Sequence, residues 1–187
     1  LPDDWQKRFH KKTISSGCGH GVTFTDASTI AEKGINRSDL SLTHENIMHL
    51  LKNFRSISGL YAKTGGVHSA ALADAKNILL FSEDIGRHNA VDKLIGKAFL
   101  QNIELQDKVL LSSGRISGEI MTKVVMNSIP MLITRTAPTC MSIAYAEHHG
   151  VTMVGFARGR RMNIYSHPLR IDLGGCKYIE GEKSIRE

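Results

Sequence analysis

Cysteine is scarce in this chain of 187 residues, which contains only Cys18, Cys140 and Cys176. An odd and widely spaced set argues against a framework of structural disulfides and is typical of a reducing compartment. Apolar runs of the ~18 residues that a membrane span needs are missing, and so is the start of a secretory signal peptide. The sequence therefore predicts a cytoplasmic protein without a membrane-spanning segment.

Several motifs of well-known enzyme classes are also missing. The chain has no Walker lysine motif, no G-x-S-x-G and no G-x-G-x-x-G. Ala70 stands two positions after His68, where a zinc deaminase has a glutamate, and the segment around Cys140 has one cysteine where such an enzyme has two. We therefore expect no zinc site.

The composition that is present is that of a globular domain. Hydrophobic residues make up 41% of the chain and charged residues 22%, which are ordinary values for one domain with a sizeable core. Lys and Arg outnumber Asp and Glu by 24 to 18, an excess that only weakly favours an anionic partner. Aromatic and basic residues do not interleave as in a base-stacking platform, so we expect no nucleic acid partner.

Helical and strand-like patterns alternate along most of the chain. Ile47, Leu50, Leu51 and Phe54 recur at helical spacing after Thr43, a suitable N-cap, and we expect residues 26–58 to be mostly helical. Further on, strand-like runs at 69–74, 77–84, 108–114, 130–137 and 152–159 alternate with helical patterns at 88–102, 118–128 and 139–150. This alternation predicts an α/β layered fold with strands covered on both faces.

Four successive strand ends carry arginine together with glycine or hydroxyl residues. Because ligands bind outside the carboxyl ends of strands in open α/β sheets, we expect these junctions to converge on one site. Backbone N–H groups at helix starts and guanidinium groups both bind phosphate, so the pattern predicts a phosphate-bearing nucleotide as ligand. The four groups are Glu83, Asp84, Arg87 and His88; Ser112, Ser113, Gly114, Arg115 and Ser117; Thr134, Arg135, Thr136 and Thr139; and Arg158, Arg160 and Arg161.

Near the start of the chain, a thiol stands among small residues that cannot pack a core. Cys18 lies in the stretch TISSGCGHGVTF, residues 13–24, with His20 two positions on. We expect residues 1–25 to form a flexible segment that carries this cysteine loop. Residues 26–173 are then the α/β cofactor-binding domain, and residues 174–187 a loosely held polar tail.

Several long segments, taken in order, closely resemble the FdhD/NarQ family of sulfur carriers required for formate dehydrogenase activity. The resemblance runs from about Thr13 to Ile171, and it implies a cytidine-deaminase-like fold of three layers, α/β/α, around a mixed sheet. Members of the family also have an additional N-terminal segment. We expect this segment to be missing from the present sequence, which begins without methionine. The matching segments are TGGVHSAAL, EDIGRHNAVDK, SSGRISGEIMTKVV, PMLITRTAPT and GFARGRRMNIYSHPLRI.

The same resemblance implies a function, a client cofactor and partners. Members take persulfide sulfur from a cysteine desulfurase and pass it to the molybdenum or tungsten bis(guanine dinucleotide) cofactor, which then enters formate dehydrogenase. By this resemblance Cys18 carries the sulfur, and GDP is an analogue of the client. His20 and Gly21 occupy places where the family often has a second cysteine. A two-fold cofactor further leads us to expect a homodimer.

The cofactor site is assigned by resemblance to the segment Phe156–Arg161, and two further turns complete it. Arginine side chains and backbone amides there would grip the pyrophosphates, and the aromatic ring would stack on a base. The predicted cofactor-binding residues are Phe156, Ala157, Arg158, Gly159, Arg160, Arg161, Ser112, Ser113, Gly114, Arg115 and Arg135.

Two other functions stay open at this point. One is an enzyme on the same scaffold that acts on a free nucleotide, with Asp84 or His88 as acid or base. The other is a chaperone that holds the cofactor without thiol chemistry, in which case replacing Cys18 would not matter.

Overall fold

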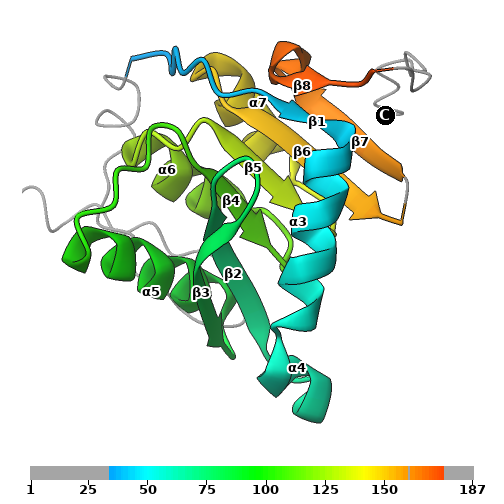
Figure 1. Ribbon diagram of the computed structural model, residues 1–187. Coiled ribbons are helices and arrows are strands. Elements are labelled where there is room, and N and C mark those ends of the chain that lie inside the picture. Colours follow the sequence, from blue (N-terminus) through cyan, green and yellow to red (C-terminus); the bar gives the residue numbers. More distant parts are fainter. Residues whose placement is uncertain (1–33, 160, 175–187) are drawn as a thin grey trace, which may run out of the picture.

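The computed structural model describes residues 34–159 and 161–174, and its centre is a six-stranded mixed sheet (Figure 1). The strand order across the sheet is β3-β2-β4-β5-β6-β7. β4, β5 and β6 are parallel, whereas β2 is antiparallel to both of its neighbours and β7 is antiparallel to β6. The strands are β2 (His68–Ala73), β3 (Ile78–Asp84), β4 (Val109–Ser112), β5 (Met131–Thr134), β6 (Thr152–Arg158) and β7 (Arg161–Ser166).

Helices cover both faces of this sheet. In Figure 1, α3 crosses in front of the strands, and α6 and α7 lie behind them. A separate two-stranded parallel pair, β1 with β8, lies beside the end of β7 at the top of the view. These elements are β1 (Leu42–Thr43), α3 (His44–Ser56), α4 (Gly59–Thr64), α5 (Arg87–Leu100), α6 (Gly118–Met126), α7 (Cys140–His148), the 3-10 turn η1 (Pro168–Arg170) and β8 (Ile171–Asp172).

The core is divided into two layers by the alternation of side chains along each strand. In β2, Ala71 and Ala73 pack with α3 on one face, while Ala70 and Leu72 pack with α5 and α6 on the other. β4 and β5 divide in the same way. The predicted α/β fold, with central strands covered on both sides, is therefore confirmed.

The predicted helix after Thr43 is present as α3. Thr43 is its N-cap, with Oγ1 accepting a hydrogen bond of 3.1 Å from the N–H of Asn46. The expectation that helix extends over residues 26–58 is wrong for residues 34–41, which contain no helix. Asn36 and Ser38 there accept hydrogen bonds from backbone N–H groups two residues ahead of them, a local pairing that competes with helix formation.

The other predicted helices and strands are found within a few residues of their expected places. α7 ends before Gly150, whose φ of 71° is the left-handed conformation expected after a helix. β7 was not predicted. β7 is an edge strand of the sheet, and exposed and partly buried residues alternate along it. Its sequence therefore has no continuous apolar run.

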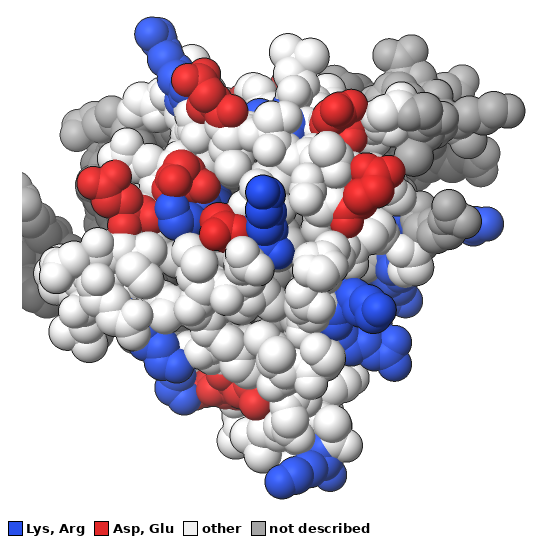
Figure 2. Space-filling view, viewed as in Figure 1, with Lys and Arg blue, Asp and Glu red and all other residues white. Residues whose placement is uncertain are grey.

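No helix in residues 34–159 and 161–174 is long and apolar enough to cross a membrane. On the face seen in Figure 2, acidic and basic side chains are mixed over the upper half, and this half carries no field of a single sign. The parts predicted as residues 1–25 and 174–187 lie largely outside the described residues.

Candidate functional site

The convergence of strand ends can be followed through the sheet. β3 points in the same direction as β4, because both are antiparallel to the β2 strand between them, and β5 and β6 are parallel to β4. The carboxyl ends of these four strands therefore lie along one rim of the sheet, together with the starts of β2 and β7. The arrowheads of β4, β5 and β6 point toward it in Figure 1. We call it the strand-end rim, and it is the position at which such sheets bind ligands.

The junction after β4 is shaped by its own serines. Ser113 donates its N–H to the carbonyl of Ser69 at 3.0 Å, and its Oγ accepts the N–H of Ser69 at 2.8 Å. The Oγ of the buried Ser112 accepts the N–H of Gly114 at 3.2 Å. Both hydroxyls are therefore engaged within the turn, and Arg115 is the exposed side chain that follows them.

The junctions after β4 and β5 form one hydrogen-bonded layer. Thr134 is fully buried and donates its hydroxyl to the carbonyl of Gly114 at 2.9 Å. Ile116 donates its N–H to the carbonyl of Ala137 at 3.2 Å. These bonds hold the two predicted turns side by side.

The arginine segment after β6 forms the end of a hairpin with β7. Arg158 pairs in register with Arg161, and the Nε of Arg158 donates to the carbonyl of Arg135 at 3.0 Å. Gly159, at the turn, has a φ of 59°, a conformation in which glycine is the default residue. The structure therefore brings Arg158 and Arg161 together in the hairpin, beside the backbone of Arg135.

Phe156 and Ala157 differ in their surroundings although they are neighbours. The side chain of Phe156 is 43% exposed and its φ is 51°, a rare value for a non-glycine residue. A Cβ on Gly155, the residue before it, would lie 2.8 Å from the ring of Tyr165. Ala157 is buried in the core on the α3 side of the sheet, so of the two only Phe156 presents a side chain to solvent.

The surroundings of Asp84 and His88, at the junction between β3 and α5, lower the pKa values of both side chains. A hydrogen bond from Lys93, with Nζ 2.5 Å from Oδ2, and another from the N–H of Gly86 lower the pKa of Asp84 to about 2. Burial lowers the pKa of His88, and the charge of Arg87 lowers it further, although Glu119 lies 3.5 Å away. At neutral pH, Asp84 is a paired carboxylate and His88 is a neutral ring.

Arg87 packs directly over the turn after β4. A Cβ on Gly114 would lie 2.9 Å from the Cβ of Arg87 and 3.3 Å from the Nδ1 of His68. Glycine is therefore required where these two side chains cross the backbone. Burial lowers the pKa of His68, and the charges of Arg87 and Arg115 lower it further.

Sequence reasoning placed Arg87 among the converging strand ends but not among the cofactor-binding residues, and it left out His68. Arg87 carried the same signal as the other junctions, because it follows a strand end in a group of polar residues. The position of His68 depends on β2 running antiparallel to β4, which no local pattern reveals.

Some predicted residues cannot be placed on this rim. Cys18, His20 and Arg160 lie outside the described residues, as does Cys176. Cys140 is exposed at the start of α7. Among residues 34–159 and 161–174, no group of three His, Cys, Asp or Glu side chains is arranged to hold a metal ion.

The model of the FdhD/NarQ family matches residues 2–172 of this chain. The chain belongs to this family. The resemblance that the sequence segments predicted is thereby confirmed over almost the whole chain, and the strand-end rim described above belongs to an FdhD/NarQ fold.

Individual relatives agree with this family. The sulfur carrier protein FdhD of Wolinella succinogenes is 43% identical over 173 residues, covering 92% of this chain and 60% of that protein. The sulfur carrier protein FdhD of Bacillus subtilis is 39% identical over 166 residues, covering 89% and 63%. This chain thus spans about three fifths of the length of these FdhD proteins.

A solved structure supports the fold independently. The crystal structure of a protein from Desulfotalea psychrophila, described as a formate dehydrogenase accessory protein, superposes with a TM-score of 0.70 at 28% identity. The superposition covers 76% of this chain and 62% of that protein.

Proposed function

We propose that this chain is the sulfur-carrying part of an FdhD protein. In this proposal Cys18 takes sulfur from a cysteine desulfurase and passes it to the molybdenum bis(guanine dinucleotide) cofactor, which then serves formate dehydrogenase. The observation that carries the proposal is the convergence, in a chain of this family, of Arg115, Arg135, Arg158 and Arg161 on one rim of the sheet.

The rim offers the groups that a guanine dinucleotide would need. Guanidinium groups form paired, charge-assisted hydrogen bonds with phosphate, and Arg158 and Arg161 face each other across the hairpin. The exposed ring of Phe156 is available to stack on a base. The cofactor is the client here rather than a resident group, and GDP is the simplest analogue of one of its arms.

The thiol step is proposed from the sequence of the Cys18 loop. The Cys18 thiolate attacks the terminal sulfur of the desulfurase persulfide; a new S–S bond forms, the old one breaks, and the desulfurase thiolate leaves. Passing this sulfur on as sulfide takes up two electrons, which we propose come from a thiol reductant. His20, when protonated, would favour the thiolate form of Cys18 by lowering the pKa of the thiol.

The rival enzyme on this scaffold could not use Asp84 as its acid, which leaves His88 for that role. With a pKa of about 2, Asp84 has no proton to give near neutral pH, and it is held in place by Lys93. The rival chaperone has no thiol chemistry, so it predicts that replacing Cys18 does not matter. The following experiment distinguishes this chaperone from the sulfur carrier.

Intact-protein mass tests the thiol step directly. After incubation with a cysteine desulfurase and free cysteine, the chain should gain the mass of about one sulfur atom, which a reductant removes. Cys18→Ala should abolish the gain, and the matched control Cys140→Ala, at an exposed thiol at the start of α7, should keep it. Loss of the adduct in Cys140→Ala alone would transfer the role to Cys140, and full maturation of formate dehydrogenase by Cys18→Ala would favour the chaperone.

Other parts of the expected picture remain predictions. They are the likeness of the sheet to that of cytidine deaminases, the lack of a zinc site in the whole chain, a cytoplasmic location and a homodimer.

A further inference from the structure

A second group of basic side chains lies on the strand-end rim, on the β2 side of the arginine hairpin. Arg87 is the first residue of α5 and His68 is the first residue of β2. Both touch the space over Gly114, within 3.3 Å of the position that a Cβ would take there. Arg115 lies close enough for its charge to act on His68.

The positive charge of this group is not neutralised within the described residues. Asp84, the nearest acid in sequence, is bound to Lys93, and Glu83 accepts hydrogen bonds from Ser58 and the backbone of α4. Among residues 34–159 and 161–174, neither Arg87 nor Arg115 forms an ion pair.

One donor of Arg87 is left without a partner. Its Nε is buried and makes no hydrogen bond. A buried donor without an acceptor is destabilising and rare in folded proteins. Such a donor, on a side chain that is itself only partly buried, indicates that an acceptor from outside the chain completes the site.

The start of α5 adds further donors at the same place. Gly86 is the N-cap of this helix of 14 residues, and no side chain caps the first turn, which contains no acid. The N–H groups of a first turn have no partners inside the helix, and the helix dipole there favours an anion. By contrast, Ser117 and Thr139 cap α6 and α7 with their side chains.

We propose that Arg87, His68 and the start of α5 form a subsite for a phosphoryl group of a nucleoside diphosphate, separate from the arginine hairpin. The identity of the nucleotide rests on the proposed function. The chemistry of the subsite would also suit inorganic pyrophosphate. Neighbouring strands lie about 4.8 Å apart, so β4 and β6 are separated by about 10 Å. One nucleotide can therefore place its terminal phosphoryl group over Gly114, its other phosphate at the arginine hairpin and its base beside Phe156.

Calorimetry on the full chain with inorganic pyrophosphate and with GDP tests this subsite. Arg87→Gln should weaken both ligands by about 10-fold or more, the usual loss for a charge-assisted contact. His68→Gln should weaken both less. Arg37→Gln is the matched control, because Arg37 is an exposed arginine outside the rim, and it should bind as the wild type does. Thermal unfolding of each variant separates loss of binding from loss of fold.

The outcomes distinguish the subsite from the wider proposal. Wild-type affinity in a folded Arg87→Gln variant, an equal loss in Arg37→Gln, or no binding of either ligand by the wild type would overturn the subsite. Arg158→Ala should weaken GDP more than pyrophosphate, since the hairpin would hold the phosphate next to the ribose and, through Phe156, the base. If the chain acquires no sulfur on Cys18 but pyrophosphate binding still depends on Arg87, the sulfur-carrier proposal fails and the subsite stands.

Discussion

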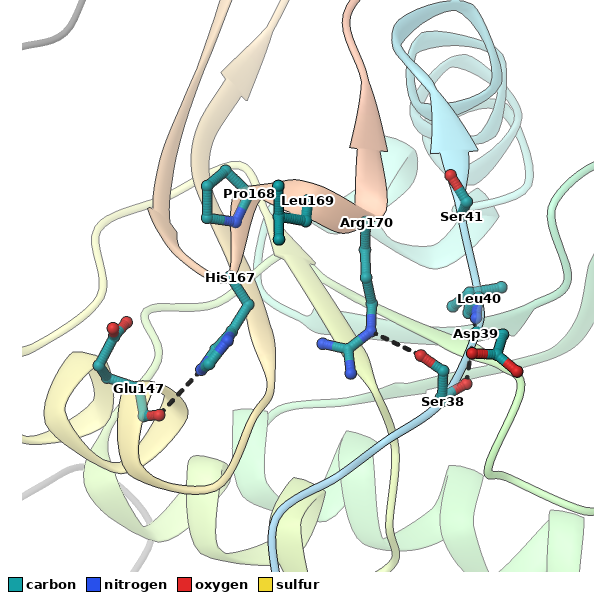
Figure 3. Close-up of a pocket in the computed structure, with 9 residues that line it drawn as sticks. All are labelled: Ser38, Asp39, Leu40, Ser41, Glu147, His167, Pro168, Leu169 and Arg170. Carbon is teal, nitrogen blue, oxygen red and sulfur yellow. Dashed lines mark hydrogen bonds between the residues drawn. The ribbon is translucent and has the colours of Figure 1, made fainter.

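Arg170 joins its own segment to two others that are distant in the sequence. Its guanidinium donates to the carbonyls of Asn36 at 3.0 Å, Ser38 at 3.1 Å and Gly150 at 2.7 Å. Figure 3 shows it pointing toward Ser38, while His167 points toward Glu147 of α7. Arg170, Ser38 and His167 are among the residues that line a pocket of about 440 Å³, at the end of the sheet opposite the strand-end rim. Burial lowers the pKa of Arg170, but its partners are neutral carbonyls, so its role is to satisfy acceptors rather than to form an ion pair.

Replacing Arg170 should therefore destabilise the fold without affecting the rim. Arg170→Met leaves three carbonyls without their donor, and we expect the free energy of unfolding to fall by about 2–4 kcal/mol. Arg170→Lys should recover only part of this, because one ammonium group does not reach acceptors in three directions.

Urea unfolding measures this loss, with Arg37→Met as the control for an exposed arginine, expected to change stability by less than about 0.5 kcal/mol. GDP affinity of folded Arg170→Met should equal that of the wild type. Equal stability of the two methionine variants would show that Arg170 does not hold the segments together.

At the same scale, the sequence predicted the residue types of the site better than their orientation. Phe156 and Ala157 were assigned to the cofactor as one run, but β6 continues to Arg158. Neighbours in a strand point to opposite faces, and Ala157 consequently belongs to the core. Ser112 and Ser113 were also assigned to the ligand, and in the structure their hydroxyls accept hydrogen bonds from backbone N–H groups at the turn.

At the scale of secondary structure elements, local sequence patterns were sufficient to predict a helix or strand wherever the element is buried on one side or both. Strands β2, β4 and β5 read as continuous apolar runs, and α3 as an amphipathic helix, since burial dictates both patterns. β7 and the extended segment 34–41 were missed because tertiary contacts hold them. β7 pairs with β6 at the edge of the sheet, and the segment is bound by Arg170.

The start of the β6–β7 hairpin depends on a glycine that has no room for a side chain. A Cβ on Gly155 would lie 2.8 Å from Tyr165 and 3.0 Å from Pro138. Gly155→Ala should therefore displace the hairpin, lower the free energy of unfolding by about 1–3 kcal/mol and weaken GDP binding.

Gly96→Ala is the control, because Gly96 is exposed within α5 with nothing near its Cβ position. It should stabilise the chain by about 0.5–1 kcal/mol. Chemical unfolding and GDP titration of both variants would check this, and an unchanged GDP affinity in Gly155→Ala would show that the hairpin does not need this close contact.

At the scale of the whole molecule, the order of strands could not be predicted from local patterns. β2 and β3 form an antiparallel pair, and β4 lies on the other side of β2. This choice depends on pairings between distant segments. It brings the ends of β3 and β4 to the same rim with β2 between them, and thus sets Arg87, His68 and Gly114 together.

The pairing of two chains is the last expectation, and it follows from the symmetry of the proposed client. The cofactor has two equivalent guanine dinucleotide arms, whereas each chain contributes one arginine hairpin between β6 and β7. Two chains would offer one hairpin to each arm, and closed two-fold pairs are the commonest oligomers.

Sedimentation velocity should therefore give a species of twice the 20.6 kDa of one chain, and calorimetry should give one GDP per chain. A species of single-chain mass at all concentrations up to ~100 μM, a concentration well above the dissociation constants of stable dimers, would contradict pairing of this chain. Two GDP per chain would instead place both arms of the cofactor on a single rim.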